Sequence, residues 1–348
     1  MPKHVFFILP VIAVLMLQGC ATPHVQTSSS GPTVSALHET FATMEDGYRL
    51  PLTVWQANGE SRAILLGLHG LNDYHNGFAS TGETLARRGI TVIAYDQRGF
   101  GNSEARGLWH GSERLTDDLR EMIALLRSRY PDQPLYLIGE SMGGAVVLAA
   151  MQDTPLATDG IILIAPAIWS RDSMPVYQRF ALWLAARTMP ALELTGDGLD
   201  LQPTDNIDMW RAWSRDPLVI KSTRVDVLYG VSNLMDQAVA SSSNLKGRML
   251  ILYGQKDEII PRQPTCQWLS SLPLETSDLR QTVIYENGYH MLTRDLQADM
   301  VLDDISDWIT GADHRLTNLQ DSIGLESFCP ESSDTRLVQG DTKPGKEK

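Results

Sequence analysis

Cysteine, histidine and positive charge are all scarce in this sequence of 348 residues. It has three cysteines and eight histidines, and their spacing does not resemble the ligand set of a metal ion. We therefore expect no metal and no organic cofactor. Lys and Arg number 29 against 42 Asp and Glu, so the formal net charge is −13 and nucleic acid is not an expected partner. The 43% hydrophobic content is typical of a globular protein.

Long apolar runs are also lacking, except at the N-terminus. Lys3 precedes an apolar run over residues 5–17, which is too short for a comfortable membrane span and typical of a signal peptide. Leu-Gln-Gly-Cys follows at 17–20 and resembles the lipobox of bacterial lipoproteins, whose cysteine is lipidated. The resemblance implies that residues 1–20 are a lipoprotein signal peptide, which is cleaved so that Cys20 becomes the first residue. Acyl chains on Cys20 would then anchor the protein. A plain secretory signal with an incidental Cys20 is the alternative.

Both ends of the remaining chain have a polar composition. Residues 21–36 are rich in Ser, Thr, Pro and Gly and predict a flexible tether, whereas residues 312–348 predict a largely disordered tail. Ala21 stands where aspartate is associated with retention in the inner membrane, so the bacterial cell envelope, at its outer membrane, is the expected location. Cys266 and Cys329 could form a bridge in an oxidising compartment, but the sequence does not give their geometry.

Between tether and tail, at residues 37–311, short apolar strands alternate with amphipathic helices. This alternation predicts an α/β fold with a mostly parallel sheet covered on both faces. Residues 166–245 interrupt the alternation with Pro, Trp and Met and with helical patterns. An unstructured loop of that length is implausible, so we expect a helical insertion that caps the carboxyl edge of the sheet. The predicted strands span residues 37–44, 48–56, 63–69, 90–96, 135–139, 160–165, 248–254 and 281–286, and the predicted helices include 77–88 and 295–310.

The most informative stretch is Gly-Glu-Ser-Met-Gly-Gly at residues 139–144. It lies between an apolar strand and an apolar helix, which predicts a tight turn with Ser141 at its apex. Gly139 and Gly143 carry no side chain, so strand and helix can approach closely around the bend. The alternative is that Ser141 is an ordinary helix N-cap.

A serine nucleophile needs a base and an orienting carboxylate, each after a later strand. Asp257 follows the strand at 248–254, and His290 follows the strand at 281–286. The order Ser, Asp, His in this strand context predicts a catalytic triad. Asp226 and Asp278 are the competing candidates for the carboxylate.

Backbone donors for an oxyanion are expected beside the serine. The loop after the strand at 63–69 begins His-Gly-Leu, and we assign the N–H groups of Leu71 and Met142 to the oxyanion hole. His69 is expected to brace this loop, and His75 is expected to be a surface residue.

Five motifs together resemble the monoacylglycerol lipase/lysophospholipase branch of the α/β-hydrolases, which is similar to the serine aminopeptidase S33 family. They lie at residues 69–74, 95–103, 139–144, 254–257 and 288–290. The resemblance implies an α/β-hydrolase fold, the roles already assigned to the triad, and a helical cap that lines an acyl-binding channel. Asn-Asp at 72–73 and Glu140 depart from the Gly-Glu and histidine frequent in the family.

The expected reaction is hydrolysis of a carboxylic ester, with a monoacylglycerol, a lysophospholipid or a similar acyl ester as substrate. An apolar stripe in the insertion could line the acyl pocket or simply pack on a neighbouring helix. A transacylase or peptidase of the same fold, or a non-catalytic envelope lipoprotein, are the alternatives. The oligomeric state is left open. The stripe consists of Val176, Phe180, Trp183 and Leu184.

Overall fold

The computed structural model describes residues 23–27, 31–152, 154–196, 198–311 and 322–330. The predicted signal peptide, with Cys20, lies outside the described residues. Among the described residues, we find no helix with the length and apolar character needed to span a bilayer.

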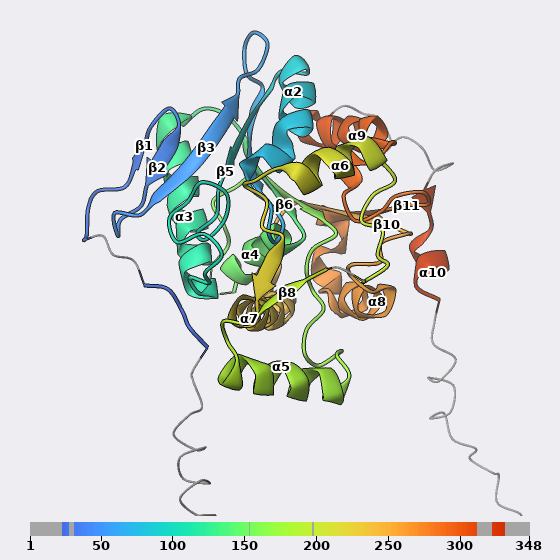
Figure 1. Cartoon of the computed structure of the whole chain (residues 1–348). Helices are drawn as coiled ribbons and strands as arrows, with labels where there is room; N and C mark the ends of the chain where they lie inside the picture. Colours follow the sequence, from blue (N-terminus) through green and yellow to red (C-terminus); the bar gives the residue numbers. More distant parts are fainter. Residues whose placement is uncertain (1–22, 28–30, 153, 197, 312–321, 331–348) are drawn as a thin grey trace, which may run out of the picture.

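A single ten-stranded sheet forms the centre of the molecule (Figure 1). Its strand order is β1-β2-β3-β5-β4-β6-β7-β10-β11-β12. The strands from β5 to β11 in this order are parallel, whereas β1, β2, β3 and β12 pair antiparallel at the two sides. The predicted, mostly parallel sheet is therefore confirmed. The strands are β1 Ala36–Leu37, β2 Phe41–Thr43, β3 Arg49–Trp55, β4 Ala63–Leu68, β5 Ile90–Tyr95, β6 Leu135–Glu140, β7 Gly160–Ile164, β10 Met249–Gly254, β11 Arg280–Tyr285 and β12 Ser322–Ile323.

Helices cover both faces of this sheet, as the apolar strands require. Every residue of β4, β5, β6, β7 and β10 is buried, which is the pattern of strands packed on two sides. Helices α2 (Ala79–Arg87) and α9 (Ala298–Thr310) contact each other on one face. The other face carries α3 (Ser112–Arg129), α4 (Met142–Ala150), α7 (Val225–Ser241) and α8 (Arg262–Ser271), seen below the sheet in Figure 1.

The predicted insertion contains two helices and a small two-stranded sheet before α7. These are α5 (Val176–Thr188), β8 (Glu193–Thr195), α6 (Ile207–Arg215) and β9 (Ser222–Arg224), with β8 and β9 paired antiparallel. Helix α7, however, packs on α4 and buries Val227, Val231 and Leu234 in the main core. The predicted boundary at residue 245 is thus too late, because residues 225–241 form a core helix. We call residues 166–224 the cap.

Part of the predicted disordered tail is ordered, and the prediction is wrong for residues 322–330. Strand β12 pairs with β11, and the short helix α10 (Leu325–Phe328) buries the Phe328 side chain. Cys329 forms a disulfide with Cys266 of α8, with an S–S distance of 2.04 Å. The prediction failed because the stretch has a low apolar content. It is nevertheless held on the domain by one buried aromatic side chain, Phe328, and by the disulfide.

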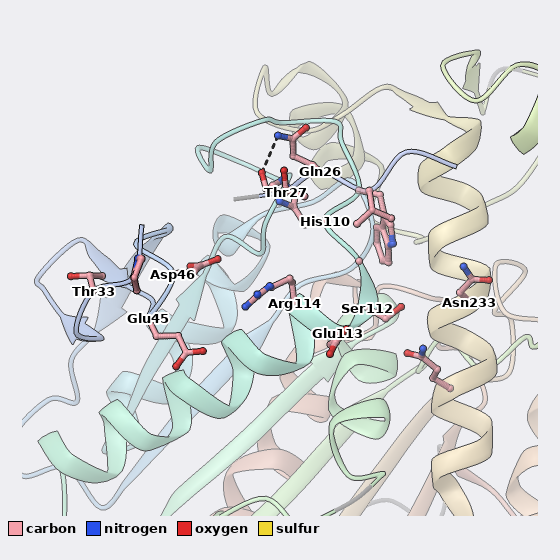
Figure 2. Close-up of a pocket in the computed structure, with 15 residues that line it drawn as sticks. Gln26, Thr27, Thr33, Glu45, Asp46, His110, Ser112, Glu113, Arg114 and Asn233 are labelled. Atoms are coloured by element: carbon pink, nitrogen blue, oxygen red, sulfur yellow. Dashed lines mark hydrogen bonds between the residues drawn. The ribbon is translucent and has the colours of Figure 1, made fainter. Parts of the chain in front are cut away.

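The segment expected to be a flexible tether makes hydrogen bonds where it is described. The Gln26 N–H donates to the Trp109 carbonyl at 2.7 Å, and the Thr33 N–H donates to the Glu45 carbonyl at 2.6 Å. Figure 2 shows the pocket that this segment encloses against the start of α3 and against α7, where Asn233 lies. Residues 28–30 of the segment lie outside the described residues.

Candidate active site

The turn around Ser141 has the strained geometry that its sequence predicts. Ser141 has φ 52° and ψ −114° at the junction of β6 and α4, and its side chain makes no capping hydrogen bond. The N-cap alternative is therefore not supported. Neighbouring backbone holds the turn, since the Ser141 N–H donates to the Ile164 carbonyl and the Ser141 carbonyl accepts from Ala167, both at 2.9 Å. Such strain persists only where surrounding structure maintains it.

The two flanking glycines are required by close backbone contact. A Cβ on Gly143 would lie 2.1 Å from the Leu68 carbonyl oxygen, and one on Gly139 would lie 2.8 Å from the Gly143 backbone. Both distances are far below van der Waals contact. The glycines therefore allow β6, α4 and the end of β4 to meet beneath the serine.

His290 and Asp257 form a buried hydrogen-bonded pair at the carboxyl edge of the sheet. The distance from His290 Nδ1 to Asp257 Oδ2 is 2.8 Å, and both side chains are almost fully buried. Asp257 Oδ1 accepts from the N–H groups of Ile259 and Ile260 at 2.8 and 3.0 Å. This carboxylate is thus fixed and acts only as an acceptor. It favours the tautomer with the proton on Nδ1, which leaves Nε2 able to accept one.

Charge around the imidazole raises its proton affinity. Burial by itself would lower the pKa of His290, but the Asp257 carboxylate, helped by Glu140, outweighs it and raises that pKa above its ordinary value of 6.5. Arg294 opposes this increase. A base with a pKa near neutral pH is suited to general base catalysis.

Two glycines bring the Asp257 and His290 loops into contact. A Cβ on Gly254 would lie 2.4 Å from the backbone of Gly288, so no other residue fits there without movement. The Lys256 N–H donates to the Gly288 carbonyl at 2.9 Å. The carboxylate and the imidazole are therefore held together by backbone as well as by their own hydrogen bond.

Of the three candidate carboxylates, only Asp257 is hydrogen-bonded to His290 among the described residues. Asp226 is buried at the start of α7 and pairs with Arg224 at 2.5 Å. Asp278 lies on the exposed 3₁₀ turn η3 (Leu274–Leu279). The competing assignments are thus not supported.

The loop after β4 passes directly beside the serine. A Cβ on Gly70 would lie 3.4 Å from Ser141 Cβ and 4.0 Å from its Oγ. Within the described part of the chain, the backbone N–H groups of Leu71 and Met142 donate no hydrogen bond. They are therefore free to bind a developing negative charge.

His69 braces this loop. Its Nδ1 lies 2.8 Å from the Gly70 carbonyl oxygen, while its Nε2 accepts from the Gln97 N–H at 3.0 Å. The Gln97 side chain donates in turn to the His69 carbonyl at 2.8 Å. Burial lowers the pKa of His69, so the ring is neutral and its Nδ1–H donates to Gly70.

His75 is not the surface residue that we expected. Its Nδ1 lies 2.6 Å from Asp96 Oδ1, and its backbone N–H donates to the same oxygen at 2.9 Å. Burial would raise the pKa of Asp96, but these hydrogen bonds and the one from the Asn102 N–H lower it. No local sequence pattern indicates this pair, because the partners lie in separate segments of the chain.

The cap is hydrogen-bonded to the loop that carries Leu71. The Ile220 N–H donates to the Asn72 carbonyl at 3.0 Å, and Asn72 Nδ2 donates to Thr223 Oγ1 at 2.7 Å. The Tyr74 hydroxyl donates to Asp216 at 2.6 Å. The end of the cap, residues 216–223, is therefore a direct support of this loop.

A second part of the cap holds the His290 loop. The Met291 N–H donates to the Pro203 carbonyl at 3.0 Å, and Thr204 Oγ1 donates to Asp295 at 2.6 Å. Asn206 Nδ2 donates to the Arg294 carbonyl at 3.0 Å. The cap thus contacts two loops that follow strands at the carboxyl edge of the sheet, the one after β4 and the one after β11.

The proposed acyl-lining stripe is largely exposed on α5. Its side chains retain 77% exposure at Val176, 60% at Phe180, 43% at Trp183 and 42% at Leu184. Helix α5 contacts α7, and Ala186 is its one fully buried side chain. The stripe is therefore not buried by packing on a neighbouring helix.

The pocket in Figure 2 is separate from these loops. It has a volume of about 970 Å³ and is lined by the N-terminal segment, the start of α3 and α7, without any triad candidate. No group of three or more potential metal ligands occurs among the described residues.

Fold and site together define a hydrolase of the α/β type: a serine on a strained strand–helix turn, with a His–Asp pair after later strands of the same parallel sheet. The sequence profile of the serine aminopeptidase S33 family (Hydrolase_4) matches residues 59–297, more than half of the chain, and the chain belongs to this family. It is a serine ester hydrolase.

Known proteins with similar sequences include two monoacylglycerol lipases and a phospholipase. The monoglyceride lipase of Rattus norvegicus is 25% identical over 279 residues, covering 78% of this chain and 89% of that protein. The monoacylglycerol lipase of Mycolicibacterium smegmatis is 25% identical over 271 residues, covering 76% and 93%. Phospholipase YtpA of Bacillus subtilis is 25% identical over 245 residues, covering 68% and 90%.

A solved structure supports the fold. The crystal structure of a soluble variant of monoglyceride lipase from Saccharomyces cerevisiae, in complex with a substrate analog, aligns with a TM-score of 0.66 at 20% identity. The alignment covers 84% of this chain and 98% of that chain. The predicted α/β-hydrolase fold is confirmed.

Proposed function

We propose that the chain hydrolyses acyl esters through a Ser141–His290–Asp257 triad and an acyl-enzyme. Ser141 Oγ attacks the ester carbonyl while His290 Nε2 takes its proton, and Asp257 holds the Nδ1–H and stabilises the imidazolium. The protonated imidazole then gives this proton to the leaving alcohol. Water repeats the sequence on the acyl-enzyme. The observation that carries the proposal is the 2.8 Å hydrogen bond between His290 and Asp257.

The oxyanion hole of this proposal consists of the Leu71 and Met142 N–H groups. Its support is the position of Gly70 beside the serine and the lack of other acceptors for these donors in the described residues. Met142 also begins α4, whose N-terminus favours negative charge. Loss of one such donor typically costs about 3 kcal/mol of transition-state stabilisation.

For the substrate, we propose a monoacylglycerol, a lysophospholipid or a similar single-chain acyl ester. This is supported by the names of the similar lipases and phospholipase and by the exposed apolar stripe on the cap. A screen of these lipids, short p-nitrophenyl esters and an aminoacyl p-nitroanilide separates the lipase from a peptidase. Product analysis with an added alcohol separates hydrolysis from acyl transfer.

The nucleophile is tested by Ser141→Ala. We expect hydrolysis of p-nitrophenyl butyrate to fall to background and labelling by a fluorophosphonate probe to disappear, because no other serine lies at the strained turn. The matched control is Ser271→Ala, which removes a serine of α8 outside the site. Circular dichroism checks that both variants fold.

Two outcomes of this experiment would count against the proposal. Retained turnover or labelling in Ser141→Ala would remove Ser141 from the mechanism. A wild-type protein inert toward both ester and probe would favour the non-catalytic lipoprotein instead.

We also propose that acyl chains on Cys20 hold the protein at the outer membrane of a bacterial envelope. The lipobox-like sequence supports this, and the Cys266–Cys329 disulfide is compatible with an oxidising compartment. Several acyl chains anchor far more firmly than one. Metabolic labelling with an alkyne fatty acid should mark the protein and fail for Cys20→Ser; equal labelling of both contradicts the anchor.

A further inference from the structure

One buried guanidinium links three loops of the active site. Arg294 Nη1 donates to Asp73 Oδ2 at 2.7 Å, and its Nη2 donates to Glu140 Oε1 at 2.9 Å. Arg294 is 8% exposed, Asp73 3% and Glu140 2%. The three residues are far apart in the sequence, so the cluster is a purely tertiary feature.

Each member of the cluster is next to a residue of the proposed mechanism. Asp73 lies two residues after Leu71, and Glu140 directly precedes Ser141. Arg294 ends the 3₁₀ turn η4 (Leu292–Arg294), which follows His290 in the same loop. The cluster thus joins the oxyanion loop, the nucleophile turn and the loop of the base.

The surrounding residues leave room for this cluster and fix its geometry. A Cβ on Gly77 would lie 2.8 Å from Asp73 Oδ2 and 3.2 Å from Arg294 Nη1, so glycine is needed beside the ion pair. The second carboxylate oxygen of Asp73 accepts from the Tyr74 N–H at 2.9 Å. Buried charges tolerate loss of a partner poorly, which makes the arrangement sharply defined.

The cluster also accounts for two unusual residues of the sequence. Asp73 and Glu140 both lie at motif positions where this chain departs from the family it resembles. Either carboxylate alone would be an unpaired charge in the interior. A single arginine, Arg294, which lies outside the five motifs, compensates both.

We propose that Arg294 is a positioning residue. Through Asp73 and Glu140 it fixes the positions of the oxyanion loop, the nucleophile and the base relative to one another. The inference rests on the proposed Ser141 mechanism. It predicts that breaking the cluster lowers the rate of the chemical step more than substrate binding, since misplacement by about 1 Å can cost on the order of 100-fold in rate.

The charged groups that face His290 provide a second test of this inference, the pH dependence of kcat/KM. They are Asp257 from the loop after β10, Glu140 from the end of β6 and Arg294 from its own loop; the two carboxylates raise the pKa of His290 and the guanidinium lowers it. Glu140→Gln keeps an oxygen for Arg294 but removes a negative charge. It should therefore lower the pKa of His290 and move the acid limb of kcat/KM to lower pH.

The experiment compares Glu140→Gln, Arg294→Met and Arg294→Lys in the full chain, using p-nitrophenyl butyrate and probe-titrated active sites. We expect Glu140→Gln to lower kcat, by less than Arg294→Met because the amide oxygen can still accept from Arg294, and to shift the acid limb down. Arg294→Met should lose on the order of 10- to 100-fold in kcat with little change in KM. Arg294→Lys should recover part of that loss.

The matched control is Arg98→Met. Arg98 is also a buried arginine between two carboxylates, Asp46 and Asp118, and both of these partners lie outside the triad loops. The Arg98→Met substitution should lower the melting temperature. It should leave the pH dependence of kcat/KM, measured per titrated active site, unchanged. If Arg294→Met and Glu140→Gln behave like this control, the positioning role is wrong.

The design separates this inference from the proposed function. If Arg294→Met does not fold, Glu140→Gln still decides, because its change is nearly isosteric. An unshifted acid limb in Glu140→Gln with normal Ser141-dependent turnover overturns the inference alone. If the Ser141→Ala variant keeps the turnover of the wild type, the proposed mechanism is overturned instead.

Discussion

In the proposed mechanism, the imidazole of His290 makes catalysis depend on pH through its hydrogen bond to Asp257. The base must be unprotonated to accept a proton from Ser141, so kcat/KM falls as the pH drops through the His290 pKa. The carboxylate raises that pKa above 6.5. The acid limb of the wild type should therefore lie above pH 6.5.

Asp257→Asn is expected to change both the midpoint and the height of this profile. The neutral amide no longer stabilises the imidazolium, so the acid limb moves to lower pH, and the wrong tautomer lowers kcat by on the order of 10⁴-fold. The measurement is kcat/KM for p-nitrophenyl butyrate from pH 5 to 9. Asp278→Asn, on the exposed turn η3, serves as control; an equal effect there would contradict the assignment of Asp257.

At the level of residues, the sequence could predict groups that belong to a local pattern. The flanking glycines predict the tight turn at Ser141, and the positions of Asp257 and His290 after strands predict that these two side chains lie close together. Arg294 and the His75–Asp96 pair had no such pattern, because their partners come from distant loops. Long-range ion pairs leave no periodic trace in a sequence.

Among the elements, α5 is the one whose role depends on the substrate. Its apolar side chains are exposed, so Phe180→Ser with Trp183→Ser should change the free energy of unfolding by only about 0.5 kcal/mol per site. If the stripe contacts the acyl chain, kcat/KM for a 16-carbon monoacylglycerol should fall several-fold while that for p-nitrophenyl acetate is kept. Hydrolysis assays across chain lengths measure the ratio.

The control for this comparison is Leu274→Ser. Leu274 is 82% exposed on η3, outside the cap, so its replacement removes apolar surface without touching the stripe. The same loss of long-chain activity in this variant, or a flat chain-length profile in all proteins, would argue against a lipid-contacting α5.

The elements themselves were predictable where apolar periodicity was strong. Buried strands such as β6 and β10 are continuous apolar runs, and they were found within one or two residues. The predicted insertion, residues 166–245, includes helix α7 because of the helix's position in the chain. The apolar face that α7 buries in the core places it in the main domain instead. Helix α8 was not predicted, since its residues lack a marked apolar stripe.

At the scale of the whole molecule, the Cys266–Cys329 disulfide closes the C-terminal segment onto the domain. The bridge spans 63 residues of sequence, and a crosslink of that size typically contributes about 2–4 kcal/mol to the free energy of unfolding. Cys329→Ser should lower the urea midpoint accordingly. Its kcat per titrated active site should equal that of the wild type, because the bridge contacts none of the three triad candidates.

Denaturation under oxidising and reducing conditions checks this prediction. The wild type should lose stability on reduction, and Cys329→Ser should not respond to the reductant. A wild-type midpoint that is independent of reductant would show that the bridge does not stabilise the fold.

Strand β12 consists of two residues, yet it is the only strand paired with the outer edge of β11 among the described residues. An uncovered strand is a template on which other polypeptides can add, and that is how many β-proteins begin to aggregate. The covalent bond at Cys329 keeps this cover in place. In protein produced where thiols stay reduced, β12 would therefore be held less firmly on the edge of β11. We expect such protein to self-associate through this edge before it loses enzymatic turnover.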